Sequence, residues 1–327
     1  MLVSVIVPNY NHSRYLKQRI DTILEQSYQN FEVIILDDCS IDDSRNIIEE
    51  YRNNNKISEI IYNKTNSGST FKQWNKGIGL AKGELIWIAE SDDFAEPDLL
   101  KNLTLEFDAD PELGIAYCQS NRVNDKNEVT GNWQFWTEDL DGALFKTRFK
   151  LPGKDYISRF LIYRNTIPNA SAVLFKKKIY KVAGGADETI LKCSDWFTWI
   201  KILLFSNIAY VPQLLNNFRY HDNSVIAMAT NDTSEKYLGV YDIFMRNRLN
   251  SFIKNSFRKK KDFEIISKKN SYLLTKEQLK EAQHYLNTDN HKKGFSKIIK
   301  ISFNSMNNIL LILRLIVNRL FSKGLKK

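Results

Sequence analysis

An apolar run ends in two adjacent carboxylates in the segment Leu85-Ile86-Trp87-Ile88-Ala89-Glu90-Ser91-Asp92-Asp93. An apolar run of this length is typical of a buried parallel strand. In open α/β sheets, ligands bind at the carboxyl ends of such strands. Two neighbouring carboxylates repel each other, so a cation, donor groups or water must offset their charge if both are ionised. The pair therefore indicates a metal-assisted nucleotide site, and a solvated turn or helix cap is the alternative.

Two earlier runs end in the same way. The run Phe31–Leu36 is followed by Asp37 and Asp38, and the run Val3–Pro8 is followed by Asn9-Tyr10-Asn11. Three buried strands would thus deliver polar side chains at the same kind of end. Helix caps do not explain this repetition well, so the metal and nucleotide interpretation gains weight over the turn interpretation.

Composition limits the class of protein. The chain has 327 residues, of which 43% are hydrophobic and 12% aromatic, as in a globular protein with a sizeable core. Its three cysteines are far apart and form no disulfide framework or zinc spacing, so a reducing cytoplasm is expected. The N-terminus lacks a basic region before its short apolar run, which predicts a strand and not a signal peptide.

The first third of the chain alternates strands with helices. Further strands are expected at 57–62, 114–117, 170–175 and 208–211, and helices at about 13–24, 42–51, 70–81, 97–107 and 196–205. This βαβα pattern predicts an α/β fold with a Rossmann-like, doubly wound, mainly parallel sheet flanked by helices. From Ser234 onward the pattern is helical, with a solvated hinge expected over Arg258–Lys269 and a separate helix starting at Thr275.

The ordered set of motifs resembles family 2 glycosyltransferases of the GT-A fold. The set comprises Val5-Ile6-Val7-Pro8-Asn9-Tyr10-Asn11, Asp37-Asp38-Cys39-Ser40, Asn66-Ser67-Gly68, Asn75-Lys76-Gly77 with Ala81-Lys82-Gly83, and Ser91-Asp92-Asp93. It runs from residue 2 to about residue 222. The resemblance implies a nucleotide-sugar donor, most often a UDP-sugar, transfer with inversion at the anomeric carbon, and Mn²⁺ or Mg²⁺ as cofactor.

The resemblance also implies roles for particular residues. Asp195 aligns with the general base, and Asp93 with the residue that binds the metal ion. Asp92 is expected near the ribose or diphosphate, and His221 in the segment that closes over the diphosphate. The remaining donor-binding positions are Pro8, Tyr10, Asn11, Asp38, Asn66, Gly68 and Asn75. Alternatives stay open: Asp195 as a helix cap, Asp38 as a loop cap and His221 as a structural histidine.

The chain departs from the family pattern at two positions. Trp74 stands where the family often has Arg, so a basic contact to the diphosphate would come from Lys72, Lys76 or Arg219. Ser194 stands where the residue before the base is often Glu. The Gln-x-x-Arg-Trp signature of processive synthases is absent, which favours the addition of a single sugar.

Most of the net charge of +9 belongs to the tail, because nine basic residues and one acidic residue lie between Asp289 and Lys327. The apolar run Ile309–Phe321 is too short and too interrupted for a membrane-spanning helix. It predicts an amphipathic helix on an anionic membrane surface. The alternatives are a helix packed on the catalytic domain or a homodimer interface. No motif supports nucleic-acid binding.

We therefore expect a GT-A catalytic domain over residues 1–233, with a nucleotide-binding half (1–120) and an acceptor-binding half (121–233). A basic helical C-terminal extension would follow over 234–327. The expected function is transfer of one sugar to a glycan or lipid-linked acceptor in surface polysaccharide synthesis, by a protein peripheral on the cytoplasmic face of the membrane. A non-catalytic sugar-nucleotide-binding subunit and a sugar nucleotidyltransferase are the alternatives.

Overall fold

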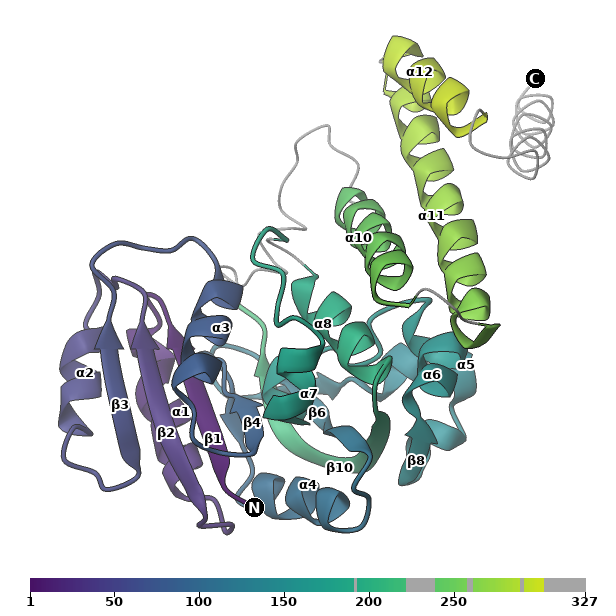
Figure 1. The fold of residues 1–327 in the computed structure, drawn as a ribbon. Coiled ribbons are helices and arrows are strands. Elements are labelled where there is room, and N and C mark those ends of the chain that lie inside the picture. The colour runs from purple at the N-terminus through teal and green to yellow at the C-terminus, as the bar shows by residue number, and fades with distance from the viewer. Residues whose placement is uncertain (191–192, 222–238, 258–260, 289–290, 303–327) are drawn as a thin grey trace. The chain divides into compact units, whose positions relative to one another are not determined.

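The structure is a computed structural model that describes residues 1–190, 193–221, 239–257, 261–288 and 291–302 (Figure 1). The chain divides into two compact units, residues 1–228 and 229–327. The first unit holds the sheet, and the described part of the second is helical. The predicted boundary at residue 233 remains a prediction.

The sheet is continuous through the first unit. Its strands follow the order β3-β2-β1-β4-β9-β6-β10-β5, with β7 beside β6 and β8 beside β10. The strands are β1 Val3–Asn9, β2 Phe31–Asp37, β3 Ile57–Tyr62, β4 Leu85–Ile88, β5 Phe94–Ala95, β6 Leu113–Val123, β7 Val129–Asn132, β8 Phe149–Pro152, β9 Val173–Lys176 and β10 Asn207–Arg219.

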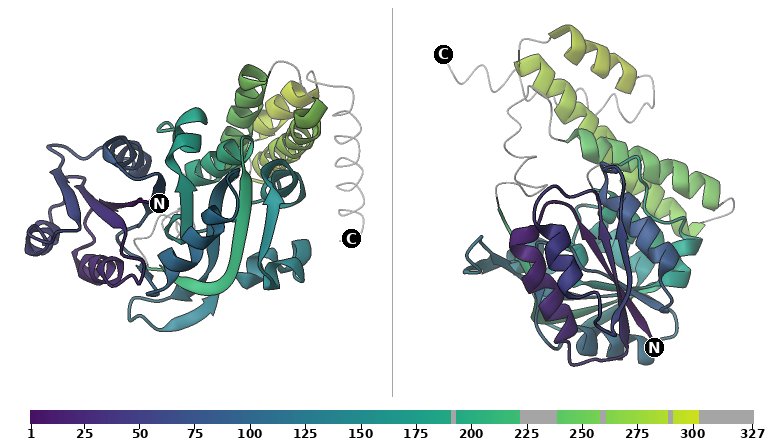
Figure 2. Two further views of the ribbon diagram at one scale, coloured as in Figure 1. Left: turned by 60° about the horizontal axis from the view of Figure 1, so that its bottom comes forward. Right: turned by 90° about the vertical axis from the view of Figure 1, so that its left-hand side faces the viewer.

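The helices of the first unit flank this sheet, as Figures 1 and 2 show. They are α1 Ser13–Leu24, α2 Ser44–Glu50, α3 Thr70–Leu80, α4 Leu99–Asp108, α5 Glu138–Asp141, α6 Gly153–Tyr156, α7 Lys177–Val182 and α8 Ser194–Leu203. Short turns of 3₁₀ or π helix cover Gln134–Thr137, Leu144–Lys146, Ile157–Leu161 and Ala170–Ala172.

Side chains along β1 point alternately to the two faces of the sheet, and different helices cover the two faces. Val3, Val5 and Val7 pack in one core with buried residues of α1, α2 and α4. Ile6 points to the other face, where the backbone of α3 at Gly77 lies against it. Alternate side chains of one buried strand therefore serve two helix layers, as a doubly wound fold requires.

The predicted strands are present, except that the strand expected at 170–175 begins only at Val173, after a turn of 3₁₀ helix. The parallel pairing of β1 with β2 and β4, and of β2 with β3, is as expected. The sheet is nevertheless mixed, because β9 runs antiparallel to both β4 and β6. Two strands are longer than predicted, since β6 and β10 pair over most of their length despite the polar residues at their ends. The short strands β5, β7 and β8 had no clear signal in the sequence.

The second unit contains α10 Val240–Ser256, α11 Lys261–Asn287 and α12 His291–Ser302. The predicted solvated hinge is wrong for residues 261–269, because they belong to α11. The predicted helix start at Thr275 is also wrong, because α11 continues through that residue. Phe263, Ile266 and Asn270 are buried at a spacing that places them on one face of that helix. The charges between them occupy the solvent side.

Among the described residues, no helix combines the length and the apolar character needed to cross a bilayer. The predicted amphipathic helix over Ile309–Phe321 lies outside the described residues.

The contact between α3 and the sheet yields a stability prediction. A Cβ added at Gly77 would lie 2.4 Å from Ile6 Cγ2, whereas a Cβ at Gly79 of the same helix meets nothing within 4 Å. We expect Gly77→Ala to lower the free energy of unfolding by about 1–3 kcal/mol through overpacking. The matched control Gly79→Ala should raise it by about 0.5–1 kcal/mol, because alanine favours the helix. Urea unfolding would measure both, and equal effects of the two changes would contradict the packing described.

Candidate active site

Polar side chains from three strand ends meet at the carboxyl edge of the parallel strands. Because β1 pairs in parallel with both β2 and β4, their ends lie next to one another. Asn9 Nδ2 donates to Asp37 Oδ1 at 3.0 Å, and the Asp38 amide donates to the Asn9 carbonyl at 2.8 Å. His12 Nδ1 lies 2.8 Å from the Ser91 hydroxyl. The polar residues that follow β1, β2 and β4 thus lie beside one another.

Asp92 stands at the centre of a cluster with two histidines. His221 Nε2 lies 3.1 Å from Asp92 Oδ2, and the rings of His12 and His221 meet edge to face at 5.7 Å. One potential ligand atom from each of the three residues lies within 4.8 Å of the others. Two imidazole nitrogens and a carboxylate oxygen form a donor set that suits a divalent transition metal.

The electrostatics of this cluster favour metal binding. Burial lowers the pKa of His12, so its ring tends to be neutral and able to coordinate. For Asp92, burial works to raise the pKa, but the hydrogen bond from His221 and the charges of both histidines lower it overall. A neutral imidazole beside an ionised carboxylate is the protonation state in which metal ligands act.

Asp93 faces a different environment. Its side chain is buried, and its Oδ1 accepts the backbone N–H of Arg219 at 2.9 Å. Burial and the neighbouring charge of Asp92 raise the pKa of Asp93 to about 7. The resemblance placed the metal on Asp93, whereas the cluster of potential ligands in the described residues contains Asp92 instead.

Two arginines lie close to these carboxylates. Arg19 is fully buried with its guanidinium 4.8 Å from the centre of the Trp87 ring, and burial lowers its pKa to about 10. Arg219, suggested from the sequence as a diphosphate ligand, donates from Nε to the Asp92 carbonyl at 2.7 Å and from a terminal nitrogen to Gln18 at 2.9 Å, and its contact with a diphosphate remains a prediction. Its remaining terminal nitrogen donates to the Asn124 carbonyl at 2.9 Å. Arg219 therefore ties the end of β10 to the loop after β4.

Trp74, which stands where the family often has Arg, is hydrogen-bonded to Glu90. The indole N–H of Trp74 donates to Glu90 Oε1 at 2.9 Å, and its ring packs near Trp199 at 5.9 Å. Burial, followed by the charge of Asp92, raises the pKa of Glu90 to about 8. The Trp74 hydrogen bond works against this rise, because it favours the ionised carboxylate. Lys72 and Lys76, the other suggested basic contacts, donate to the Ser67 carbonyl and to Asn63.

The expected base-binding positions lie around Asp38. Its carboxylate accepts hydrogen bonds from the Ser67 amide at 3.0 Å, from the Ser67 hydroxyl at 2.7 Å and from Gln73 Nε2 at 3.0 Å. Asp38 thus makes the hydrogen bonds expected of a loop cap, and its contact with a donor remains a prediction. Asn66 Oδ1 accepts the Gly68 amide at 2.6 Å in a turn where Gly68 has φ +70°.

The other donor-binding positions divide into two groups. Pro8 is buried, Tyr10 is exposed, and Asn11 accepts the Ile41 amide at 2.8 Å, all beside the Asp38 loop. Asn75 lies elsewhere: its amide donates to the Ala186 carbonyl at 3.0 Å and accepts the Ala186 N–H at 3.1 Å. Asn75 therefore holds the 180–188 segment, and its contact with a donor remains a prediction.

Asp195 lies in the first turn of α8. The helix N-cap is Cys193, with φ +66° and no side-chain capping bond, so Asp195 is not the cap. Asp195 Oδ2 accepts a hydrogen bond from Asn165 Nδ2 at 2.9 Å. Burial raises the pKa of Asp195 to about 6, which is suitable for a general base near neutral pH.

Sequence reasoning missed His12, Arg19 and Asn165. His12 had a signal, because it directly follows the polar end of the first strand. Arg19 and Asn165 had none, since neither belongs to a motif and their positions depend on tertiary packing.

Comparisons with known proteins identify the family and the fold of this chain. Residues 4–181, more than half of the chain, match the model of glycosyl transferase family 2. The chain therefore belongs to glycosyl transferase family 2, and the predicted family is confirmed.

One similar sequence is the glycosyltransferase GlyG of Streptococcus pneumoniae, 34% identical over 143 residues, which are 43% of this chain and 45% of GlyG. Another is the poly(ribitol-phosphate) β-N-acetylglucosaminyltransferase TarS of Staphylococcus aureus, 38% identical over 106 residues, which are 31% of this chain and 18% of TarS. The aligned region thus spans less than half the length of either relative.

Two solved structures share the fold. TarS residues 1–349 in complex with UDP-GlcNAc gives a TM-score of 0.60 at 18% identity, covering 93% of this chain and 91% of that chain. The mannosyltransferase PcManGT of Pyrobaculum calidifontis, with GDP-Man and Mn²⁺, gives 0.56 at 17% identity, covering 97% and 80%. At these identities the similarity concerns the fold, and it confirms a GT-A-like α/β architecture followed by helices.

The raised pKa of Asp93 predicts a pH-dependent stability. Because its folded pKa is about 7 and its unfolded pKa about 4, the stability that Asp93 contributes is present below pH 4 and is lost as the pH rises through 7. Asp93→Asn should therefore stabilise the metal-free protein at pH 8 by on the order of 1–3 kcal/mol and have little effect at pH 4.5.

Urea unfolding at the two pH values would measure this difference. The exposed Asp108 offers a matched control, and Asp108→Asn should shift stability equally at both. An equal shift for Asp93→Asn at pH 4.5 and pH 8 would contradict the assigned protonation.

Proposed function

We propose that this chain is an inverting, metal-dependent glycosyltransferase that moves one sugar from a nucleotide-diphosphate sugar to a hydroxyl group. The observation that carries the proposal is the cluster of Asp92, His12 and His221 at the carboxyl edge of β1 and β4, in a chain of this family. A UDP-sugar is the proposed donor, supported by the UDP-GlcNAc complex of TarS.

The cluster supports a proposed metal site. His12, Asp92 and His221 would hold Mn²⁺ rather than Mg²⁺, because Mg²⁺ prefers oxygen ligands. The neighbouring Asp93 is buried and bonded to the Arg219 backbone. A cation bound there would act as a Lewis acid that offsets negative charge on the departing diphosphate. The nucleoside would lie along the Asp38 loop, with Pro8, Tyr10 and Asn11 on one side and Asn66 and Gly68 on the other.

The proposed chemistry then needs one base. Asp195 would accept the proton of the acceptor hydroxyl as that oxygen attacks the anomeric carbon from the side opposite the diphosphate. Asn165 orients the carboxylate by its hydrogen bond to Oδ2. A single displacement inverts the anomeric centre, because no glycosyl-enzyme bond forms.

The acceptor is proposed to be a glycan or lipid-linked glycan of a surface polysaccharide, in keeping with the polymer named for TarS. Attachment to the inner face of an anionic membrane is also proposed. It is supported by α12, where Phe295 and Ile299 are exposed on a helix that also carries Lys292 and Lys300. A non-catalytic binding subunit is the alternative, and a test of turnover separates the two.

Asp195→Asn tests the proposed chemistry. Asparagine keeps an oxygen for Asn165 but cannot take a proton, so turnover should fall by about 10²–10⁴-fold while UDP binding stays unchanged. Release of UDP from a panel of UDP-sugars, with Mn²⁺ and candidate glycan acceptors, would measure turnover. Asp155→Asn, at an exposed carboxylate of α6, is the control and should retain activity. Full turnover by Asp195→Asn would exclude this role.

The pH dependence of turnover offers a second test. The base acts only when deprotonated, and the pKa of Asp195 is about 6. The rate constant kcat should therefore fall about tenfold for each pH unit below 6 and level off above about pH 7. The residual activity of Asp195→Asn should lack this inflection. A wild-type profile that is flat between pH 5 and pH 8 would contradict the assignment.

A further inference from the structure

The two histidines beside Asp92 are each held by a single polar contact. His12 Nδ1 lies 2.8 Å from the Ser91 hydroxyl, and His221 Nε2 lies 3.1 Å from Asp92 Oδ2. Neither ring makes a further hydrogen bond to the described residues. One contact leaves an imidazole able to tilt and turn about it, whereas a metal ligand needs a fixed ring orientation, which surrounding groups usually supply. Another contact must therefore fix these two rings.

The ring of Tyr15 packs against both imidazoles. Its centre lies 6.3 Å from that of His12 and 5.3 Å from that of His221, and the two imidazole centres lie 5.7 Å apart. These separations are typical of aromatic rings in contact, so the three rings form a closed triangle in which each contacts the other two. Of the described residues, Tyr15 is the one other aromatic side chain that contacts this pair of histidines.

The start of α1 brings Tyr15 to this position. His12 is the N-cap of α1, and its carbonyl accepts the Tyr15 amide at 2.9 Å. Residues three apart are neighbours on the surface of a helix, so the phenol ring lies beside the first imidazole. His221 comes from the chain that follows β10. Tyr15 therefore connects two histidines that lie far apart in the sequence.

Tyr15 is itself held in place by its surroundings. The residue is only 8% exposed, and the guanidinium of Arg219 lies 4.5 Å from the centre of its ring, as in a cation–π contact. Its hydroxyl group donates to Asp125 Oδ1 at 3.3 Å, in the turn between β6 and β7. Arg219 also donates to the Asp92 carbonyl at 2.7 Å. The residue that packs on Tyr15 is thus bonded to the loop that carries the carboxylate of the cluster.

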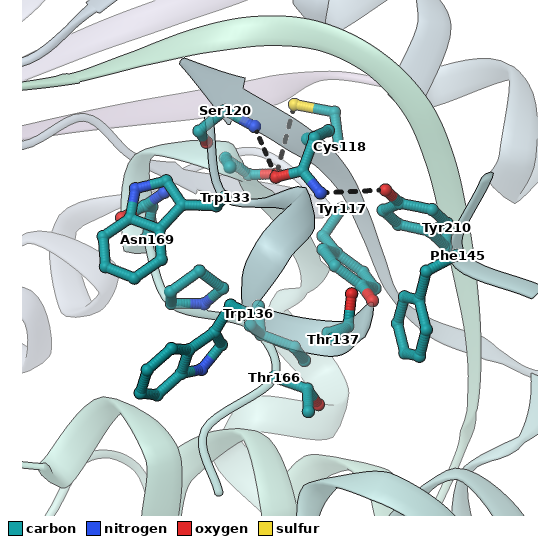
Figure 3. Close-up of a pocket in the computed structure, with 14 residues that line it drawn as sticks. Tyr117, Cys118, Ser120, Trp133, Trp136, Thr137, Phe145, Thr166, Asn169 and Tyr210 are labelled. Atoms are coloured by element: carbon teal, nitrogen blue, oxygen red, sulfur yellow. Dashed lines mark hydrogen bonds between the residues drawn. The ribbon is translucent and has the colours of Figure 1, made fainter. Parts of the chain in front are cut away.

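A second group of aromatic side chains lies around β6 and β10, and it serves another purpose (Figure 3). Trp133, Trp136, Phe145 and Tyr210 line a cavity whose free volume of about 10 Å³ has room for about one water molecule. The residues that line this cavity include neither Asp92 nor the two histidines. This second group therefore does not orient the proposed metal ligands.

We propose that Tyr15 is a positioning residue for the proposed metal site, an inference that rests on the proposed function. Its ring holds the imidazoles of His12 and His221 in the orientation in which they bind Mn²⁺ together with Asp92. The ring carries this role, because the ring contacts both imidazoles whereas the hydroxyl group bonds to Asp125. Loss of a group that orients metal ligands typically weakens metal binding by about 10–100-fold.

Binding of Mn²⁺ to the full-length chain without UDP tests this role, and the electron paramagnetic resonance signal of free Mn²⁺ measures it. Asp92→Asn first identifies the binding that belongs to the cluster. Tyr15→Leu removes the ring and should weaken that binding by about 10–100-fold. Tyr15→Phe keeps the ring and should bind within about threefold of wild type, because it loses only one long hydrogen bond.

Tyr51 offers a matched control for the loss of a buried tyrosine. It is 9% exposed, its hydroxyl group donates to Asp21 at 2.5 Å, and the Lys17 ammonium lies 5.5 Å from the centre of its ring. Tyr51→Leu should lower the urea midpoint of unfolding about as much as Tyr15→Leu does, but should leave Mn²⁺ binding unchanged. A purely structural role of Tyr15 would make the two variants alike in both measurements.

Tyr15→Met is a second variant without the ring and should show the same loss of Mn²⁺ binding. Wild-type affinity in either folded variant would overturn the inference and leave the proposed function intact. If neither variant folds while Tyr51→Leu does, Tyr15 serves the fold and the inference is also overturned. Wild-type protein that binds no more Mn²⁺ than Asp92→Asn would instead refute the proposed metal site, and the role of Tyr15 with it.

Discussion

The arrangement of this fold depends on the negative charge collected where the central parallel strands end. Glu90, Asp92 and Asp93 lie within four residues and are largely withdrawn from water. Buried charges persist only when partners offset them. Arg19 from α1 lies near them, and Arg219 from β10 bonds to the loop that carries them. The raised pKa values of Glu90 and Asp93 indicate that these partners compensate the charge only in part.

The groups that meet this charge come from the end of β10 and from the start of α1. β10 runs for thirteen residues and ends at Arg219, which bonds to the Asp92 carbonyl, and His221 follows two residues later. α1 begins directly after His12. Segments more than a hundred residues apart in the sequence therefore build one cluster. A divalent cation bound at Asp92, as we propose, would offset the negative charge that Arg19 and Arg219 do not fully compensate.

Much of this architecture could be predicted from the sequence, for identifiable physical reasons. Buried strands such as Phe31–Asp37 can be recognised by their continuous apolar runs, and the order of the motifs indicated the family. The sequence could not reveal which carboxylate of the Asp92–Asp93 pair faces the histidines. The two residues are chemically identical neighbours, and only the loop conformation decides which way each side chain points. The sequence also did not indicate that α11 is continuous, because its many charged residues lie between the few residues of its buried face. The partners of Asn75 and Asn165 depend on packing between segments far apart in the chain.

The most direct test of the account is the position of manganese in a crystal grown with UDP and MnCl₂. Anomalous scattering locates the ion without reference to activity. The account predicts a single peak bounded by Asp92 Oδ2, His221 and His12, with UDP along the Asp38 loop and no direct bond from the ion to Asp93. A peak coordinated by Asp93, or UDP bound in the absence of any ion at Asp92, would contradict the assignment of this cluster as the metal centre.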